Sequence, residues 1–454
     1  MNIKSSKIIS DKERKGYKFR LIVPNSDIEH QLNKIVGSCR FVWNKALALL
    51  KEDNDNYRTI SQMCKMNGGT ADGITSEFKF NPYNQLSKLL TKWKQEPDTV
   101  FLKDVYSKSL QITLEELGQA IVEAKSKTNP KRYPVFKKRG VKDSFSFNGT
   151  IKHDEVNGRI FIPKLGVWLN YNKSRDVLGT IKNVTISKQA EKWYVSLQAE
   201  RELTQVNPKW VDANRILGID VGVVKTISSS DTINFEYQSQ QITTNQLDSI
   251  NPLRKYQTKL ANLQKLLSRK TKFSKNWNKI RSKISNLHTK IANIRKDFTH
   301  KVTTAISKSY AYVSVEALKI KNMSKSAKGT LENPGKNIKQ KSGLNKSILD
   351  QGWGMFKTLL TYKLKYNFGT ELIEVNPQYS SQKCSHCGDI HKENRKNQAN
   401  FNCISCGFTI NADINASLNI KAAGLAVLAS RGIEIAQPMK EEPTELGDSV
   451  TAIA

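Results

Sequence analysis

The earliest regular pattern in the chain is an alternation of apolar and polar residues over 17–23, which predicts a strand with one buried face. Pro24 ends it, because proline cannot donate a hydrogen bond to a neighbouring strand. From Ile28 to about Lys127 apolar residues recur every three or four positions, so this segment is predicted to be helical. Strand-like runs return between about 144 and 199. Short strands at this spacing predict a small β-barrel that the first strand joins across the helical insert.

The pattern changes after residue 207. Three short apolar runs predict a meander of strands, and two later runs predict strands that are linked by helices. A meander followed by helix-linked strands predicts a mixed α/β sheet of the ribonuclease-H type. The five runs are 216–221, 226–228, 233–237, 311–315 and 371–375.

A long helical stretch from Leu253 to Tyr310 separates the meander from the later strands. Its second half has apolar residues at alternating spacings of three and four, the heptad pattern that pairs helices. The first half has a shorter seam of the same kind, so we expect a helical hairpin over 252–310 that turns at 270–274. The seams are Trp277, Ile280, Ile284, Leu287, Ile291, Ile294 and Phe298, and Tyr256, Leu260, Leu263 and Leu267.

Length and charge indicate the number of domains and the kind of binding partner. The 454 residues are too many for one ordinary core, so we expect two or three domains. Lys and Arg outnumber Asp and Glu by 73 to 41, and the net charge of +32 would repel itself unless a polyanion neutralises it. Nucleic acid fits this charge, and an acidic membrane surface is the alternative. No apolar run reaches the roughly 20 residues of a membrane span, and residues 1–20 lack a signal-peptide core. We therefore expect no membrane partner and a cytoplasmic, prokaryotic, nucleoid-associated location.

The predicted hairpin carries much of the positive charge. Between Leu253 and Val302 its only acid is Asp297. The plain interpretation is a solvated face with salt bridges between residues four apart. Because these cations lack acidic partners, we favour contact with phosphates. The candidates are Lys265, Arg269, Lys272, Lys279 and Arg281.

Four of the six cysteines form two Cys-x-x-Cys pairs. Residues 388–402 separate them, a 15-residue spacing within the roughly 15 to 20 of a four-cysteine zinc site. Gly388 and Gly407 allow each pair to turn tightly onto one ion. This predicts a structural Zn²⁺ site, since four thiolates leave no open position for chemistry. A redox dithiol pair is the alternative. The ligands would be Cys384, Cys387, Cys403 and Cys406.

Three acidic residues stand at the ends of predicted strands or at the start of a predicted helix. Asp220 and Glu316 each end a strand, and Asp413 opens a helical segment. Neighbouring parallel strands could bring the first two together, and the helix could add the third. Three such carboxylates can hold two Mg²⁺ or Mn²⁺ ions about 3.5–4 Å apart, the arrangement that hydrolyses phosphodiesters. Gly218 and Gly222 would leave room beside Asp220 for a substrate backbone.

Each acid also has a plain interpretation. An Asp after a strand is usually a turn residue, an Asp before a helix is usually its N-cap, and a Glu at a strand end is usually solvated. What favours catalysis is the position of these acids among other motifs along the chain.

Those motifs, taken in order, resemble the TnpB proteins of insertion sequences. These are compact RNA-guided nucleases related to type V CRISPR effectors. The resemblance covers most of the chain. It rests on residues 17–21, 37–44 and 132–139, on Ser144 and Phe145, and on 218–222, 315–318, 350–354, 379–388 and 412–416.

The resemblance implies a RuvC nuclease domain of the ribonuclease-H type with an inserted zinc ribbon, and a wedge β-barrel interrupted by a helical recognition domain. The RuvC metal ligands would be Asp220, Glu316 and Asp413. Arg132, Lys137, Lys138 and Arg139 of a central basic motif would join the nucleic-acid contacts. The expected boundaries are 1–30 and 129–206 for the wedge barrel, 31–128 for the recognition domain, 207–379 and 411–432 for the nuclease domain, 380–410 for the ribbon, and 433–454 for an acidic disordered tail.

The resemblance also implies two partners: a guide RNA encoded at the transposon end, and double-stranded target DNA with a short flanking motif. The activity would be that of an RNA-guided DNA endonuclease of a transposable element. Asn411 and Ala412 depart from the Asp and Arg that many relatives carry, without removing a metal ligand.

Three alternatives stay open. The protein could be an RNA-guided DNA-binding regulator that has lost cleavage, a miniature type V CRISPR effector, or a zinc-ribbon nucleic-acid protein whose acids are incidental. The polar segment 319–346, just past Glu316, is predicted to be either a mobile lid over the bound strand or a plain linker.

Overall fold

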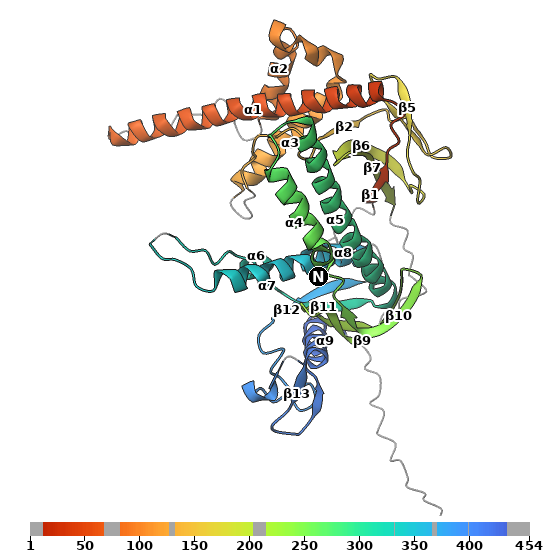
Figure 1. Cartoon of the computed structure of the whole chain (residues 1–454), viewed down its shortest axis with the longest axis vertical. Helices are drawn as coiled ribbons and strands as arrows, with labels where there is room; N and C mark the ends of the chain where they lie inside the picture. The colour runs from red at the N-terminus through yellow and green to blue at the C-terminus, as the bar shows by residue number, and fades with distance from the viewer. Residues whose placement is uncertain are drawn as a thin grey trace, which may run out of the picture. The chain divides into compact units, whose positions relative to one another are not determined.

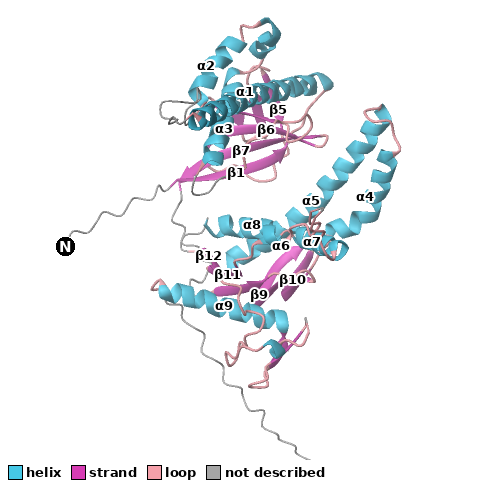
Figure 2. Cartoon of the chain, turned by 90° about the vertical axis from the view of Figure 1, so that its left-hand side faces the viewer, coloured by secondary structure: helices cyan, strands magenta, loops and turns pink. Residues whose placement is uncertain are grey.

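The computed structural model describes residues 12–67, 82–126, 132–202, 215–330, 332–365, 370–397 and 399–433. Contacts divide the chain into two compact units, residues 1–203 and 204–454. Figure 1 labels their elements, and Figure 2 distinguishes helices from strands. The boundary predicted at residue 207 and nearly all of the predicted acidic tail lie outside the described residues.

The first unit contains two antiparallel sheets. The larger has the order β1-β7-β6-β2, and the smaller has the order β3-β4-β5. An isolated bridge between Leu21 and Tyr171 connects the larger sheet's first strand to the smaller sheet. The pairing of β1 with β7 confirms that the first strand joins strands beyond the helical insert, whereas a closed barrel is not shown. The strands are β1 (Lys12–Arg20), β2 (Ser144–Asn148), β3 (His153–Asp154), β4 (Arg159–Ile162), β5 (Val167–Asn170), β6 (Thr180–Gln189) and β7 (Lys192–Glu202).

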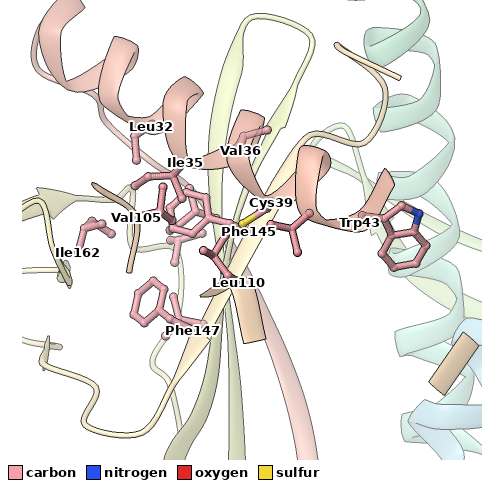
Figure 3. Packing of buried hydrophobic residues seen from close by; sticks show 14 of the residues in the cluster. Leu32, Ile35, Val36, Cys39, Trp43, Val105, Leu110, Phe145, Phe147 and Ile162 are labelled. Carbon is pink, nitrogen blue, oxygen red and sulfur yellow. The ribbon is translucent and has the colours of Figure 1, made fainter. Parts of the chain in front are cut away.

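Among the described residues, three α-helices follow β1, which confirms the predicted helical character there; residues 68–81 and 127 of the predicted segment lie outside the described residues. The helices are α1 (Ser26–Met66), α2 (Tyr83–Trp93) and α3 (Ser107–Lys125), with a 3-10 helix at Pro97–Asp104. The side chain of Asn25 accepts a hydrogen bond from the Ile28 N–H at 2.9 Å and so satisfies one free amide at the start of α1. The buried side of α1, including Leu32 and Cys39, packs with Phe145 of β2 in one core (Figure 3).

The second unit is built on a five-stranded mixed sheet of order β10-β9-β8-β11-β12. Strands β8, β9 and β10 are antiparallel, and β11 runs parallel to both β8 and β12. The runs predicted at 226–228 and 233–237 are one strand, and β10 was missed because its sequence is mostly polar. The strands are β8 (Ile216–Asp220), β9 (Lys225–Tyr237), β10 (Gln240–Asp248), β11 (Tyr312–Glu316) and β12 (Glu371–Val375).

Helices cover both faces of this sheet. On one face, α5 (Lys275–Ser309) and α8 (Trp353–Lys365) share a core with the sheet that includes Leu217 and Ile219. On the other face lies α9 (Ala412–Ser430), whose Ile420 packs with Ile216. Successive residues of β8 therefore point into different cores, as the two-residue repeat of a strand requires.

Two glycines allow α9 to lie unusually close to the sheet. A Cβ on Gly218 of β8 would overlap the backbone carbonyl oxygen of Ser417 in α9, and one on Gly424 of α9 would overlap the hydroxyl of Ser314 in β11. The room at Gly218 is thus filled by a helix, and our expectation that it admits a substrate backbone was wrong.

The predicted helical hairpin is present. Helix α4 (Pro252–Ser268) packs against α5 through Leu260, Leu287 and Ile291, which belong to the two predicted seams. The segment 319–346 contains α6 (Ile320–Met323) and much of α7 (Ile338–Gln351). The Lys341 ammonium donates to the Met323 carbonyl at 2.6 Å and thereby ties these helices together.

Among the helices of the described residues, none combines the length and the apolar character that crossing a membrane requires.

We predict that Gly424→Ala destabilises the second unit by about 1–3 kcal/mol, because the added methyl group has no space against Ser314. The measurement is the midpoint of urea unfolding of the full chain. Gly343→Ala in α7 is the matched control, since a Cβ there meets nothing within 4 Å, and alanine suits a helix interior better than glycine. Equal midpoints for the two variants would contradict the close approach of α9.

Candidate functional site

The two strand-end acids lie at the same edge of the sheet. In the parallel pair β8 and β11, Ile219 stands opposite Val315, so Asp220 and Glu316 are the next residues of adjacent strands. Asp413 lies in the first turn of α9, which packs against both strands. Three segments separated by about a hundred residues each thus bring their carboxylates to one region.

Asp220 lies within electrostatic range of the other two acids. Burial raises its pKa to about 7, and the negative charges of Glu316 and Asp413 add to the effect. Burial also raises the pKa of Glu316, opposed by a hydrogen bond of 2.6 Å that the Ser380 hydroxyl donates to it. Their carboxylate oxygens do not all lie within 4.8 Å of one another; among the described residues only the four paired cysteines form so compact a group.

Arg395 is the main residue of this region that sequence reasoning missed. Its guanidinium donates to a carboxylate oxygen of Asp413 at 3.1 Å, and its positive charge lowers the pKa of Asp220. It lies between the two cysteine pairs, in a polar stretch that looks like a solvated loop. No local pattern in the sequence distinguishes it from neighbouring cations such as Lys396.

Asn411, which precedes α9, caps the helix that carries Asp413. Its side-chain oxygen accepts hydrogen bonds from the N–H groups of Asp413 and Ile414, at 3.0 and 3.2 Å, and so caps α9. It also accepts from the Gln246 amide of β10 at 2.9 Å. Asparagine is among the best N-cap residues, and here it fixes the turn that carries Asp413.

A polar network supports the loop that follows Asp220. The buried side chain of Gln351 accepts from the hydroxyls of Thr226 and Ser249, at 2.8 and 2.9 Å. It donates to the Val223 carbonyl and to the side chain of Asn251. One residue thereby joins that loop, strand β9, the residue that follows β10 and the start of α4. The neighbouring Asp350, also buried, forms an ion pair with Arg295 of α5 and accepts from the Leu253 N–H.

The four paired cysteines form a compact cluster. All four sulfurs lie within 4.8 Å of one another, with 3.8 Å between Cys384 and Cys406 and 3.6 Å between Cys387 and Cys403. A tetrahedral zinc with bonds of about 2.3 Å separates its sulfurs by about 3.8 Å. The cluster is therefore consistent with a structural zinc ribbon. Gly388 and Gly407 follow the pairs with φ of 84° and 72°, the left-handed conformation expected there.

The ribbon is anchored directly to α9. Its short strands are β13 (Asn400–Asn402) and β14 (Thr409–Asn411). Asn415 donates to the Lys383 carbonyl at 2.8 Å and accepts from the Ser385 N–H at 3.0 Å. Asn419, one turn later, donates to the carbonyls of Ser380 and Lys383. The first cysteine pair is therefore fixed to the helix that carries Asp413.

The predicted phosphate-binding cations fall into two groups. The hairpin cations Lys265, Arg269, Lys272, Lys279 and Arg281 are exposed, and none forms an ion pair with a described residue. In the other group Arg132, Lys138 and Arg139 are exposed, but the ammonium of Lys137 lies 3.8 Å from the Trp43 ring, and burial lowers its pKa. Lys137 thus has a packing role, and phosphate contact by either group stays a prediction.

Comparison with protein families gives three matches. Residues 194–327 match the OrfB_IS605 family, described as "Probable transposase". Residues 353–420 match "Cas12f1-like, TNB domain", and residues 14–56 match "Helix-turn-helix domain" of the OrfB_IS605 type. In this structure the last range forms β1 and part of one continuous helix, α1.

Two curated proteins and one solved structure illustrate the similarity. The chain is 43% identical to "Putative RNA-guided DNA endonuclease InsQ" of Escherichia coli (strain K12), over 96% of this chain and 98% of that protein. It is 26% identical to "CRISPR-associated endodeoxyribonuclease Cas12f1" of Sulfoacidibacillus thermotolerans, over 54% of this chain and 53% of that protein. A cryo-EM structure of a Cas12f1–sgRNA–target DNA complex aligns at 16% identity over 90% of this chain and 99% of that chain, with a TM-score of 0.29.

We expect about one zinc ion per chain by elemental analysis, and loss of that zinc in Cys403→Ser. Because Asn415 and Asn419 bond the backbone around the first cysteine pair, removing zinc with a chelator should also lower the thermal midpoint. Cys64→Ser is the control, since Cys64 lies in α1, outside the cluster. Full zinc content in Cys403→Ser would contradict the site.

We also expect Asp220→Asn to raise the thermal midpoint of the metal-free protein at pH 8. A folded pKa near 7 lies above the unfolded value, so the stability that Asp220 contributes at low pH is lost as the pH rises through about 7. The midpoint should rise by about 2–4 °C for each kcal/mol by which burial and repulsion disfavour the charged Asp220, and the gain should vanish at pH 4. Asp248→Asn, whose side chain is 81% exposed, is the control. An unchanged midpoint at pH 8 would count against the acidic cluster.

Proposed function

Because the chain belongs to the TnpB/IS605 OrfB family, we propose that it is an RNA-guided, metal-dependent DNA endonuclease of a transposable element. The observation that carries this proposal is that Asp220, Glu316 and Asp413 lie in one region. The negative charges of Glu316 and Asp413 help to raise the pKa of Asp220. The similarity to a protein named as an RNA-guided DNA endonuclease supports it, since that similarity extends over 96% of this chain.

The second unit has the strand order that a RuvC assignment needs. An antiparallel meander of β8, β9 and β10 continues into the parallel strands β11 and β12, as in the ribonuclease-H-like sheet predicted from the sequence. Two acids end the central strands, and the third follows the zinc ribbon. In the first unit the two sheets would form the wedge, and α1, α2 and α3 would form the recognition domain. The pairing of β1 with β7 supports this division.

The donor set fits Mg²⁺ or Mn²⁺. Asp220, Glu316 and Asp413 offer only carboxylate oxygens, the ligands that these hard cations prefer. Bound there, the metal ions would activate a water molecule and stabilise the leaving oxygen of a phosphodiester. They would also neutralise a cluster in which burial and mutual repulsion disfavour the charged form of Asp220.

The neighbouring residues would orient this chemistry. Ser380 holds one oxygen of Glu316 through its 2.6 Å hydrogen bond, and Asn411 fixes the turn at Asp413. Arg395 restrains Asp413 and presents a guanidinium, a group suited to binding a phosphate through two parallel hydrogen bonds. We propose that Arg395 binds the phosphate next to the cleaved bond and gives up part of its contact with Asp413 when it does so.

The guide RNA would supply sequence recognition, and the protein would bind backbones and read a short flanking motif. The net charge of +32 and the exposed cations of the hairpin suit this division of labour. A regulator without cleavage is the second candidate, but it would be expected to lack an acid, and all three are present. The similarity to a Cas12f1 protein over 54% of the chain leaves a CRISPR effector as the third.

We predict that Asp220→Ala abolishes DNA cleavage while RNA binding persists. Losing about 4 kcal/mol of metal-dependent transition-state stabilisation lowers the rate about 10³-fold. The protein is co-purified with RNA transcribed from its own locus and given a plasmid library with Mg²⁺, and sequencing the cut plasmids identifies the flanking motif. Asp248→Ala, which removes only a surface ion pair with Lys225, should cut like the wild type. Undiminished cleavage by Asp220→Ala would refute the assignment of the site.

A further inference from the structure

The turn between α4 and α5 exposes a large aromatic side chain. Phe273 is 70% exposed to solvent. Its backbone has a φ of 69°, in the left-handed region that bulky residues avoid. Figure 2 shows the hairpin extending away from the sheet of its own unit, with this turn at the far end. A glycine or asparagine would suit the backbone better, and a polar residue would suit the solvent better.

The turn is held in this conformation by several hydrogen bonds. The Ser274 N–H donates to the Thr271 carbonyl at 3.1 Å, and the Ser274 hydroxyl accepts from the Trp277 N–H at 3.1 Å. The side-chain amide of Asn278 donates to the carbonyl of Phe273 itself at 3.0 Å. The backbone that carries the ring is therefore held by the turn, and strain held by its surroundings is typical of functional sites.

Cations lie beside the exposed ring and beside its aromatic neighbour Trp277. The Phe273 and Trp277 ring centroids lie 5.5 Å apart with planes tilted by 60°. The Lys272 ammonium lies 5.2 Å from the Phe273 ring centre, and the Arg281 guanidinium lies 5.6 Å from that of Trp277. Residues 253–296 contain no acid at all. An aromatic surface set among unpaired cations is the combination that binds single-stranded nucleic acid, by stacking on bases and neutralising phosphates.

We propose that Phe273 is a stacking site for one unstacked base of the bound nucleic acid, with the adjacent cations on the flanking phosphates. This inference rests on the proposed function, because it needs RNA or DNA bound to the second unit. The base belongs either to the guide RNA or to a strand of the target DNA. The ring supplies a flat apolar face, and Lys272 supplies charge beside it. Lys275 and Lys279, which follow in the sequence, are also exposed.

The test measures binding to the full-length chain carrying Asp220→Ala, so that no strand is cut. The probes are single strands of about 20 nucleotides, one of RNA and one of DNA, each with 2-aminopurine at successive positions. Phe273→Ala should weaken binding about tenfold and abolish the change in 2-aminopurine emission, as expected for the loss of one base–aromatic stack. Phe273→Trp should retain both.

Phe273→Gly separates binding from stability. Glycine adopts the left-handed conformation without strain, so this variant should unfold at the same temperature as the wild type or higher. It should nevertheless bind as weakly as Phe273→Ala. Leu266→Ala is the matched control on the same hairpin, since Leu266 is an apolar side chain that is 47% exposed. It should bind like the parent.

The outcomes are distinct. If Phe273→Ala weakens binding of the RNA probe alone, the site belongs to the guide. If it weakens binding of the DNA probe alone, the site belongs to the target. If Phe273→Ala binds both probes as tightly as the parent does, the stacking site is overturned and the proposed nuclease function stands. If the parent binds neither RNA nor DNA, the proposed function itself fails and this inference fails with it.

Discussion

The close contact between α9 and the sheet is the constraint on which the candidate site depends. Gly218 and Gly424 lie where a single methyl group would collide with Ser417 or Ser314. This approach brings Asp413 into the electrostatic range of Asp220. The same helix holds the cysteine cluster, because Asn415 and Asn419 donate to backbone carbonyls beside the first cysteine pair. The fit of one helix against two strands thus governs both candidate metal centres.

Charge is distributed unevenly around that contact. The protein is strongly basic overall, yet three acids share one partly buried region, where burial and repulsion raise the pKa of Asp220. A cation relieves this conflict, and Arg395 supplies one from the ribbon at 3.1 Å from Asp413. The ribbon therefore adds a charged side chain to the site as well as a folded support beside it. In contrast, the exposed hairpin cations from Lys265 to Arg281 form no ion pair with a described residue, which suits an external polyanion.

Patterns with a short period could be predicted from the sequence, and contacts between distant segments could not. The seam through Leu260, Leu287 and Ile291 follows from heptad spacing, and the sulfur cluster follows from the paired cysteines. The strand β10 escaped notice because a half-exposed edge strand needs few apolar residues. Short strands at even spacing led us to expect a barrel, but such spacing does not reveal how the sheets join. Ser380 and Arg395 were missed because each is an ordinary polar residue locally and contacts the acids only in three dimensions. The roles of individual site residues remain predictions.

The order of the acids along the chain has a consequence for biosynthesis. Asp220 and Glu316 lie on strands that a ribosome delivers well before α9, and until that helix emerges the sheet face at Ile216 and Ile373 has no cover. The nascent polypeptide thus holds at most two of the three carboxylates while the first unit is already free to fold. The third carboxylate joins the site only when α9 has been synthesised. A chain whose translation stops before Asp413 is therefore released without the complete group of three acids.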